Sequence, residues 1–165
     1  FIIRWPGKVP AGRVSNEMVH VTDLYTTLAG MGGAAVPTDR AVDGVDQGAF
    51  LLGKQEKSAR EFFPVFMTTG ELYAMKWRNY KLHLIWQMRM HDVPQKLAVP
   101  RLIDLYDNPQ ERHEETLGES AAVTRGWVLH AMFAHLAKFQ ESLKKYPPIP
   151  MGTSDPYQPP AMKKP

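Results

Sequence analysis

LYAMKWRNYKLHLIW, residues 72–86, holds two runs of alternating apolar and polar side chains on either side of a short turn, Arg78-Asn79. Alternation at every second residue is typical of a strand that buries one face. Two such runs joined by a tight turn predict a β-hairpin. Residues 72–77 and 80–86 are therefore expected to be neighbouring strands of an antiparallel sheet.

Two further strands are predicted outside the hairpin. Phe62 to Thr68 is an apolar run in which Pro64 favours an edge strand or a bulge, because proline cannot donate a ladder hydrogen bond. Leu102 to Tyr106 is a fourth short strand, which the turn formers of residues 107–109 close. The segment from Gln87 to Pro100 is expected to be a loop.

A long helix is predicted after the sheet, from near Thr124 to the residue before Pro147. Its apolar side chains recur every three or four residues and form one stripe: Val128, Met132, Leu136, Phe139 and Leu143. Such a stripe is typical of a helix that packs on a sheet. The predicted fold class is α+β, a small antiparallel sheet of about four strands packed against a long C-terminal helix.

The first 55 residues indicate different elements. Phe1 to Trp5 is expected to be a buried strand that ends at a Pro-Gly turn. A helix is predicted from the N-cap Thr22, with Asp23 in its first turn, up to the glycines that begin at Gly30. Residues 34–48 indicate a linker, and Phe50 to Gly53 the end of a short helical turn.

The predicted first strand indicates that the chain is part of a longer protein. A lone strand must pair with something, and the sequence opens without an initiator Met or a signal peptide. We therefore expect that the chain was cut from a longer protein whose upstream part holds the rest of the sheet. An unpaired apolar strand invites association, so the isolated chain is expected to self-associate.

Composition excludes several functional classes. The net charge is +3 with dispersed Lys and Arg, whereas a nucleic-acid binder usually shows a denser basic stripe. No apolar run approaches the length of a membrane span. The absence of Cys excludes disulfides, thiolate metal sites and a Cys nucleophile within these 165 residues.

The residues alone offer little catalysis. There is no His-Glu-x-x-His zinc pattern, no phosphate-binding glycine loop and no Gly-x-Ser-x-Gly elbow. Asp39, Asp43 and Asp46 lack the spacing and the terminal Glu of a calcium loop, so they are interpreted as turn formers. Without a family the sequence indicates a soluble α+β piece and no metal site.

Five phrases in order nevertheless resemble the C-terminal third of the sulfatase family, nearest to arylsulfatase-like members. They are residues 1–12, 20–30, 43–46 with 50–53, 73–83 and 105–111. Thr26 stands where the family usually has Pro. The resemblance implies that residues 1–55 are the tail end of an alkaline-phosphatase-like α/β catalytic domain, that residues 56–146 form a C-terminal subdomain, and that residues 147–165 are a Pro-rich tail.

The resemblance also implies what this chain lacks. Sulfatases use a formylglycine nucleophile, made from the Cys or Ser of a Cys/Ser-x-Pro-x-Arg motif, and a calcium ion that binds the sulfate. In family order these groups lie upstream of Phe1, and this sequence has no such motif. We expect no catalytic residue and no metal ligand here. The expected role is to complete the fold of a sulfatase and to wall its substrate pocket.

One residue is expected to reach that pocket. Arylsulfatase-like members carry a histidine beyond the hairpin that faces the substrate, and His91, eight residues after His83, matches its place. The resemblance implies that His91 binds an anionic substrate and that residues 87–91 form part of the rim. His83 is interpreted as pointing off the hairpin in a structural role, and Lys81 as a surface charge.

Two alternatives stay open. The parent could be a phosphonate or phosphate monoester hydrolase of the same superfamily, or the chain could be a binding module for sulfated glycans without catalysis. The partners implied are an upstream catalytic domain and a sulfated small molecule or glycan, with no nucleic acid. By family resemblance the parent is expected in the periplasm or outside the cell.

Overall fold

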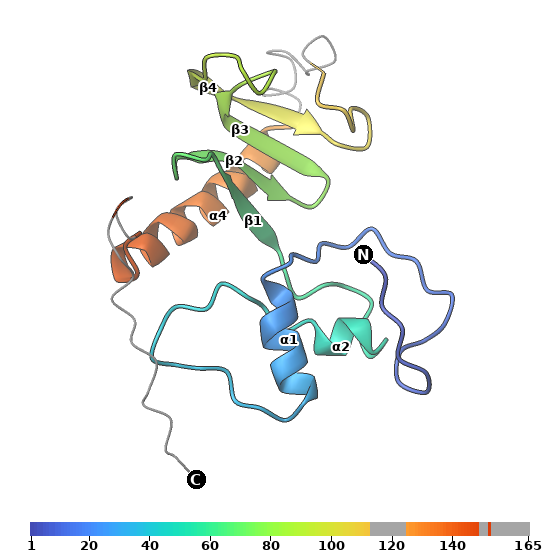
Figure 1. The fold of residues 1–165 in the computed structure, drawn as a ribbon. Helices are drawn as coiled ribbons and strands as arrows, with labels where there is room; N and C mark the ends of the chain where they lie inside the picture. The colour runs from blue at the N-terminus through green and yellow to red at the C-terminus, as the bar shows by residue number, and fades with distance from the viewer. Residues whose placement is uncertain (113–124, 149–151, 153–165) are drawn as a thin grey trace.

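The computed structural model describes residues 1–112, 125–148 and 152 (Figure 1). Two helices precede a four-stranded sheet, and a long helix follows it. The elements are α1 (Asp23–Met31), α2 (Gly48–Leu51), β1 (Phe62–Phe66), β2 (Leu72–Trp77), β3 (Tyr80–Trp86), β4 (Gln95–Asp104) and α4 (Gly126–Lys145). Within these ranges no helix has both the length and the apolarity that crossing a membrane requires.

The sheet is antiparallel throughout, in the order β1-β2-β3-β4. The hairpin is confirmed at the predicted residues: Trp77 pairs with Tyr80, and Arg78 makes the turn with a positive φ of 52°. The α+β fold class is therefore confirmed. Each strand follows the one before it in space, as short hairpin connections require.

The fourth strand is longer than predicted. β4 begins at Gln95 instead of Leu102, so residues 95–100 are strand and not loop. They pair with the far end of β3, where Trp86 faces Gln95 and Ile85 faces Lys96. The register shifts between these pairs and the pairs nearer the turn. Most of the added residues are exposed, so the segment lacks the apolar alternation that would have indicated a strand.

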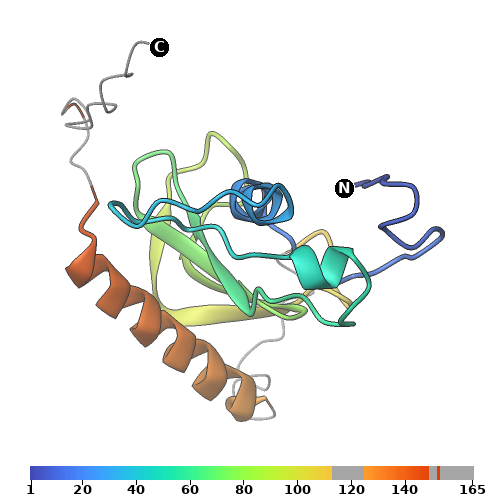
Figure 2. The ribbon, with the colours of Figure 1, turned by 90° about the horizontal axis from the view of Figure 1, so that it is seen from below.

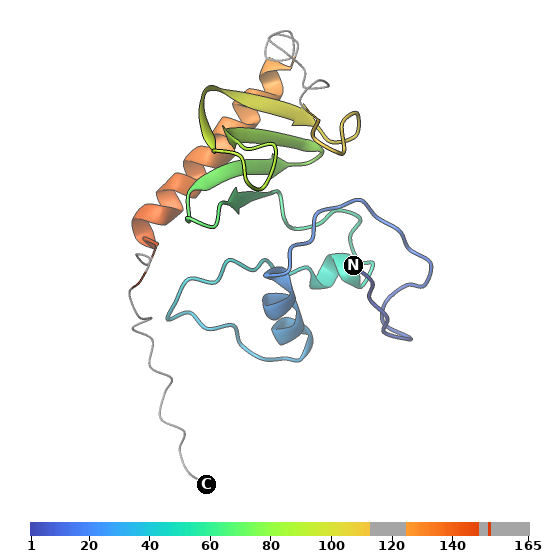
Figure 3. The same cartoon turned by 45° about the horizontal axis from the view of Figure 1, so that its top comes forward.

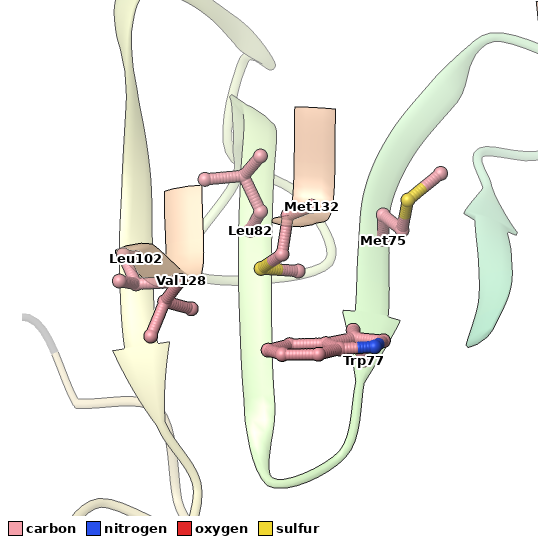
Figure 4. Packing of buried hydrophobic residues seen from close by; sticks show 6 residues of the cluster. All are labelled: Met75, Trp77, Leu82, Leu102, Val128 and Met132. Atoms are coloured by element: carbon pink, nitrogen blue, oxygen red, sulfur yellow. The ribbon is translucent and has the colours of Figure 1, made fainter. Parts of the chain in front are cut away.

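The core lies between the sheet and α4, which runs along one side of the sheet (Figure 2). Figure 4 shows side chains of α4 among side chains of three strands. The buried cluster consists of Met75, Trp77, Leu82, Leu102, Val128 and Met132. The rest of the predicted stripe of α4 is partly buried. Burying apolar side chains of this size stabilises the fold by about 1.5 to 3 kcal/mol each.

The helices α1 and α2 lie together on the β1 side of the sheet (Figures 1 and 3). α1 turns polar residues inward, since Asp23 and Thr27 are buried while Tyr25 and Leu28 are exposed. Asp23 accepts hydrogen bonds from the Arg60 guanidinium, at 2.9 and 3.0 Å from Nε, and from the backbone N–H of Val45 at 2.9 Å. This ion pair ties α1 to the segment that leads into β1.

A buried glutamine completes the same connection. The backbone N–H of Gln47 donates to Thr27 Oγ1 at 2.9 Å, and its side-chain Oε1 accepts from the N–H of Ala59 at 3.0 Å and from Ser58 Oγ at 3.1 Å. The buried side chains of Asp23, Thr27 and Gln47 therefore all have hydrogen-bond partners, as burial demands.

The predicted first strand does not form within this chain. Residues 1–5 form no strand, and Phe1 and Ile2 are 76% and 95% exposed. A strand needs a neighbour to complete its hydrogen bonds, and no segment within the described ranges pairs with this one. The turn that follows is present, because the N–H groups of Lys8 and Val9 both donate to the Trp5 carbonyl. The predicted Pro-rich tail, apart from residues 147, 148 and 152, and the predicted helix start at Thr124 lie outside the described residues.

Candidate functional site

A polar hollow of about 310 Å³ opens beside the hairpin and the turn that follows β4. The hairpin supplies one wall, and the segment after Pro109 supplies the other. Its lining residues are Tyr73, Lys81, His83, Trp86, Gln87, Met88, Gln110, Glu111 and Arg112. The volume lies at the lower end of the range for small-molecule sites.

Glu111 is held in position by the turn that precedes it. Its φ is 53°, a left-handed conformation that costs a non-glycine residue about 1 kcal/mol. The buried side chain of Asn108 accepts a hydrogen bond from the N–H of Arg112 at 2.9 Å and donates one to the Arg112 carbonyl at 3.0 Å. Asn108 thus fixes the backbone directly after Glu111 and compensates the strained conformation.

The Glu111 carboxylate lies between two side chains of β3. One oxygen lies 2.7 Å from Lys81 Nζ and the other 2.6 Å from His83 Nε2. Burial opposes ionisation of Glu111, but the hydrogen bonds from His83 and Lys81 and the positive charge of Lys81 hold its pKa at about 2. The interpretation of Lys81 as a surface charge is wrong, because its side chain is only 17% exposed and ion-paired.

His83 lines the hollow from β3. Its side chain is 1% exposed, and its ring lies edge-on to the rings of Tyr73 and Trp86, with both centroid distances 5.1 Å. Nδ1 is buried without a hydrogen-bond partner among the described residues. Glu111 therefore fixes the imidazole orientation through Nε2, and aromatic rings pack beside it. His83 is a built-in part of the site and does not point away from the hairpin.

Tyr73 connects the hollow to the loop between β3 and β4. Its hydroxyl donates to the Gln87 carbonyl at a long 3.4 Å. Burial and the nearby charge of Glu111 raise the pKa of Tyr73, so the hydroxyl stays a donor at neutral pH.

His91, the predicted substrate-binding residue, lies at the exposed turn of that loop. It does not line the hollow, whereas Gln87 and Met88, from the predicted rim segment, do. The structure therefore brings the start of the rim segment to the hollow and leaves His91 beyond it. Its contact with a substrate stays a prediction.

Metal binding does not fit the described residues. Within 1–112 and 125–148 no group of three or more His, Cys, Asp or Glu side chains is placed to hold an ion. The calcium ion that the family resemblance implies therefore has no such ligand group among these described residues.

Most residues of the site were not predicted as site residues, among them Tyr73, His83, Asn108 and Glu111. Glu111 lies 28 residues from His83, and no local spacing indicates that they meet. Asn108 was interpreted as a turn former. One feature of the sequence could have indicated Glu111. It ends the family-like segment Leu105 to Glu111, which follows the strand that pairs with Lys81 and His83.

Comparisons with known proteins agree on one family. No protein-family model matches the chain. N-acetylgalactosamine-6-sulfatase of Canis lupus familiaris is 40% identical over 80 residues, which are 48% of this chain and 15% of that protein. Arylsulfatase D of Homo sapiens is 35% identical over 88 residues, 53% of this chain and 14% of that protein.

A solved structure extends the likeness to nearly all of the chain. The PsFucS1 sulfatase from Pseudoalteromonas sp. superimposes with a TM-score of 0.73 and 27% identity, covering 90% of this chain and 30% of that one. The chain thus spans less than a third of the length of each of these relatives. The chain is therefore similar to the C-terminal portion of arylsulfatase-like members of the sulfatase family.

Proposed function

We propose that this chain is the C-terminal part of an enzyme that hydrolyses sulfate esters. The observation that carries the proposal is the superposition on the PsFucS1 sulfatase over 90% of the chain. The 34–40% identity to curated sulfatases over about half of the chain supports the same reaction.

In this proposal residues 1–55 belong to the catalytic domain and residues 56–146 form a C-terminal subdomain. The apolar side chains that α1 leaves exposed, Tyr25 and Leu28, support packing against the upstream domain. The formylglycine nucleophile and the calcium ion belong to that upstream domain. When bound, they would supply the nucleophile and the charge that stabilises the sulfate. The residues of this chain complete the fold and wall the pocket.

The substrate is proposed to be a sulfated small molecule or glycan, and His91 to contact its anionic part. His91 is exposed on a loop that begins at the polar hollow. An imidazole there can donate a hydrogen bond to a sulfate or carboxylate oxygen.

The test compares substrates that share an aryl leaving group and differ in the group that is transferred. The whole protein would be assayed on 4-nitrophenyl sulfate, 4-nitrophenyl phosphate and an aryl phosphonate monoester. We expect kcat/KM for the sulfate to exceed the other two by at least about tenfold, which corresponds to about 1.4 kcal/mol in the transition state. A preference for the phosphonate or the phosphate would replace the proposal with the related hydrolase. Binding of sulfated glycans without any turnover would favour the non-catalytic module.

A further inference from the structure

The loop of residues 87–94 carries His91 but buries little apolar surface that could hold it. Met88, Met90 and Val93 are 58%, 88% and 82% exposed. Side chains that remain in water contribute little to fixing a loop, so its shape depends on polar contacts.

Gln87 supplies two of these contacts. Its side-chain amide donates one hydrogen bond to the Met90 carbonyl at 3.0 Å and one to the Asp92 carbonyl at 2.9 Å. A glutamine amide has two N–H donors, and both are used here. The two carbonyls belong to the residues on either side of His91, so one side chain fixes the backbone before and after it.

Other contacts shape the turn and hold Gln87. The Asp92 carboxylate accepts from the N–H of Arg89 at 2.9 Å, and the N–H of Asp92 donates to the Arg89 carbonyl at 3.0 Å. These bonds are local to the turn. Gln87 ties the turn to the end of β3, and the Tyr73 hydroxyl ties Gln87 to the hollow. The loop is therefore supported from the wall that contains His83.

We propose that Gln87 is a positioning residue that holds His91 in the orientation in which it contacts the substrate. This inference rests on the proposed role of His91. A loop side chain that binds a ligand needs neighbours that fix its geometry before the ligand arrives. Gln87 provides that support by donating to the carbonyls of Met90 and Asp92. Its effect on the substrate is indirect, because it positions His91.

The experiment is a double-mutant cycle in the whole enzyme on an aryl sulfate. Its variants are His91→Ala, Gln87→Ala and both together, with Gln87→Glu as a second variant that keeps the size but loses the donors. Gln55→Ala is the matched control, because Gln55 donates a similar hydrogen bond to the Lys57 carbonyl at 2.8 Å in another exposed segment.

We expect His91→Ala and Gln87→Ala each to raise KM about five- to tenfold and to change kcat less than about twofold. This pattern is expected when the lost interaction is equally strong in the bound substrate and in the transition state. The double variant should have the KM of His91→Ala, since removing the support of an absent side chain has no further effect. Gln87→Glu should behave like Gln87→Ala, and Gln55→Ala should match the unmodified enzyme.

Three results would overturn the inference, and they differ from one another. If His91→Ala leaves KM unchanged, the proposed role of His91 fails and the inference fails with it. If His91→Ala raises KM and Gln87→Ala does not, the inference alone fails. If the two effects multiply in the double variant, Gln87 acts independently of His91 and is not its positioning residue.

Discussion

The guanidinium of Arg60 donates to both carboxylate oxygens of Asp23, which lies 37 residues earlier in the chain. The side chain of Asp23 is fully buried and that of Arg60 is 9% exposed. The pair joins α1 to the segment that leads into β1. It thereby fixes the position of α1 relative to the sheet. Removing one partner of such a pair leaves the other charge buried and uncompensated.

Asp23→Asn should therefore destabilise the chain by about 3 kcal/mol, because Arg60 loses its counter-charge. The free energy of unfolding in urea measures this. Asp39→Asn is the control, since Asp39 and Arg40 form a pair whose side chains are 66% and 39% exposed. The control should change stability by less than about 0.5 kcal/mol. Equal effects of the two substitutions would contradict the structural role of Asp23.

Acid should weaken the fold through two carboxylates. Burial raises the pKa of Asp23, but hydrogen bonds from Arg60, Val45 and His20 outweigh it and hold the pKa at about 2, and that of Glu111 is also about 2. Both pKa values lie below the ordinary values of 3.8 and 4.5. Their contribution is present above about pH 5 and is lost as pH falls toward 2.

Each carboxylate should account for about 2 to 3 kcal/mol of this loss. Urea unfolding at several values between pH 7 and pH 2.5 measures the total. The slope should be shallower in Asp23→Asn and in Glu111→Gln, because each variant removes one titrating group. A slope that both variants leave unchanged would show that other groups carry the acid sensitivity.

Glu111→Gln should also lower stability at neutral pH, by about 1 to 3 kcal/mol, because Lys81 and His83 lose a charged acceptor in a partly buried site. Thermal unfolding followed by circular dichroism is the measurement. Glu141→Gln is the matched control, as Glu141 pairs with Lys144 on the exposed surface of α4. If both variants unfold at the same temperature, Glu111 does not organise the hollow.

Gly44→Ala should be destabilising by about 1 to 3 kcal/mol. A Cβ at this position would lie 2.4 Å from the Thr22 carbonyl oxygen and 2.5 Å from Thr26 Oγ1, so the backbone would have to move. Gly126→Ala serves as the control, because a Cβ there meets nothing within 4 Å. Calorimetry of both variants should show a lower Tm for Gly44→Ala alone. An unchanged Tm for Gly44→Ala would contradict the close packing of Gly44 against Thr22 and Thr26.

The sequence predicted those elements whose pattern is local. The hairpin follows from apolar residues at every second position, and the stripe of α4 from apolar residues at every third or fourth position. Both spacings are local and can be read without knowing the tertiary contacts. β4 was predicted too short because residues 95–100 become a strand only through pairing with β3. The predicted strand at residues 1–5 failed for the converse reason: its apolar residues find no neighbour among the described segments.

The site was less predictable than the fold. Glu111 meets His83 because a turn after β4 brings it back over β3, and Asp23 meets Arg60 across a linker. In both contacts the two residues are far apart in the chain, and no local sequence pattern indicates that they meet. The family resemblance indicated His91 and the catalytic groups expected upstream, whereas the polar hollow and the Gln87 contacts emerged from the structure.

The release of inorganic sulfate from an aryl sulfate, measured side by side for the whole protein and for residues 1–165 alone, tests the central claim most directly. We predict turnover by the whole protein and none by the isolated chain, which has neither Cys nor a Ser-x-Pro-x-Arg motif from which formylglycine could form. Enzyme-like sulfate release by the isolated chain, or none by the whole protein, would contradict it.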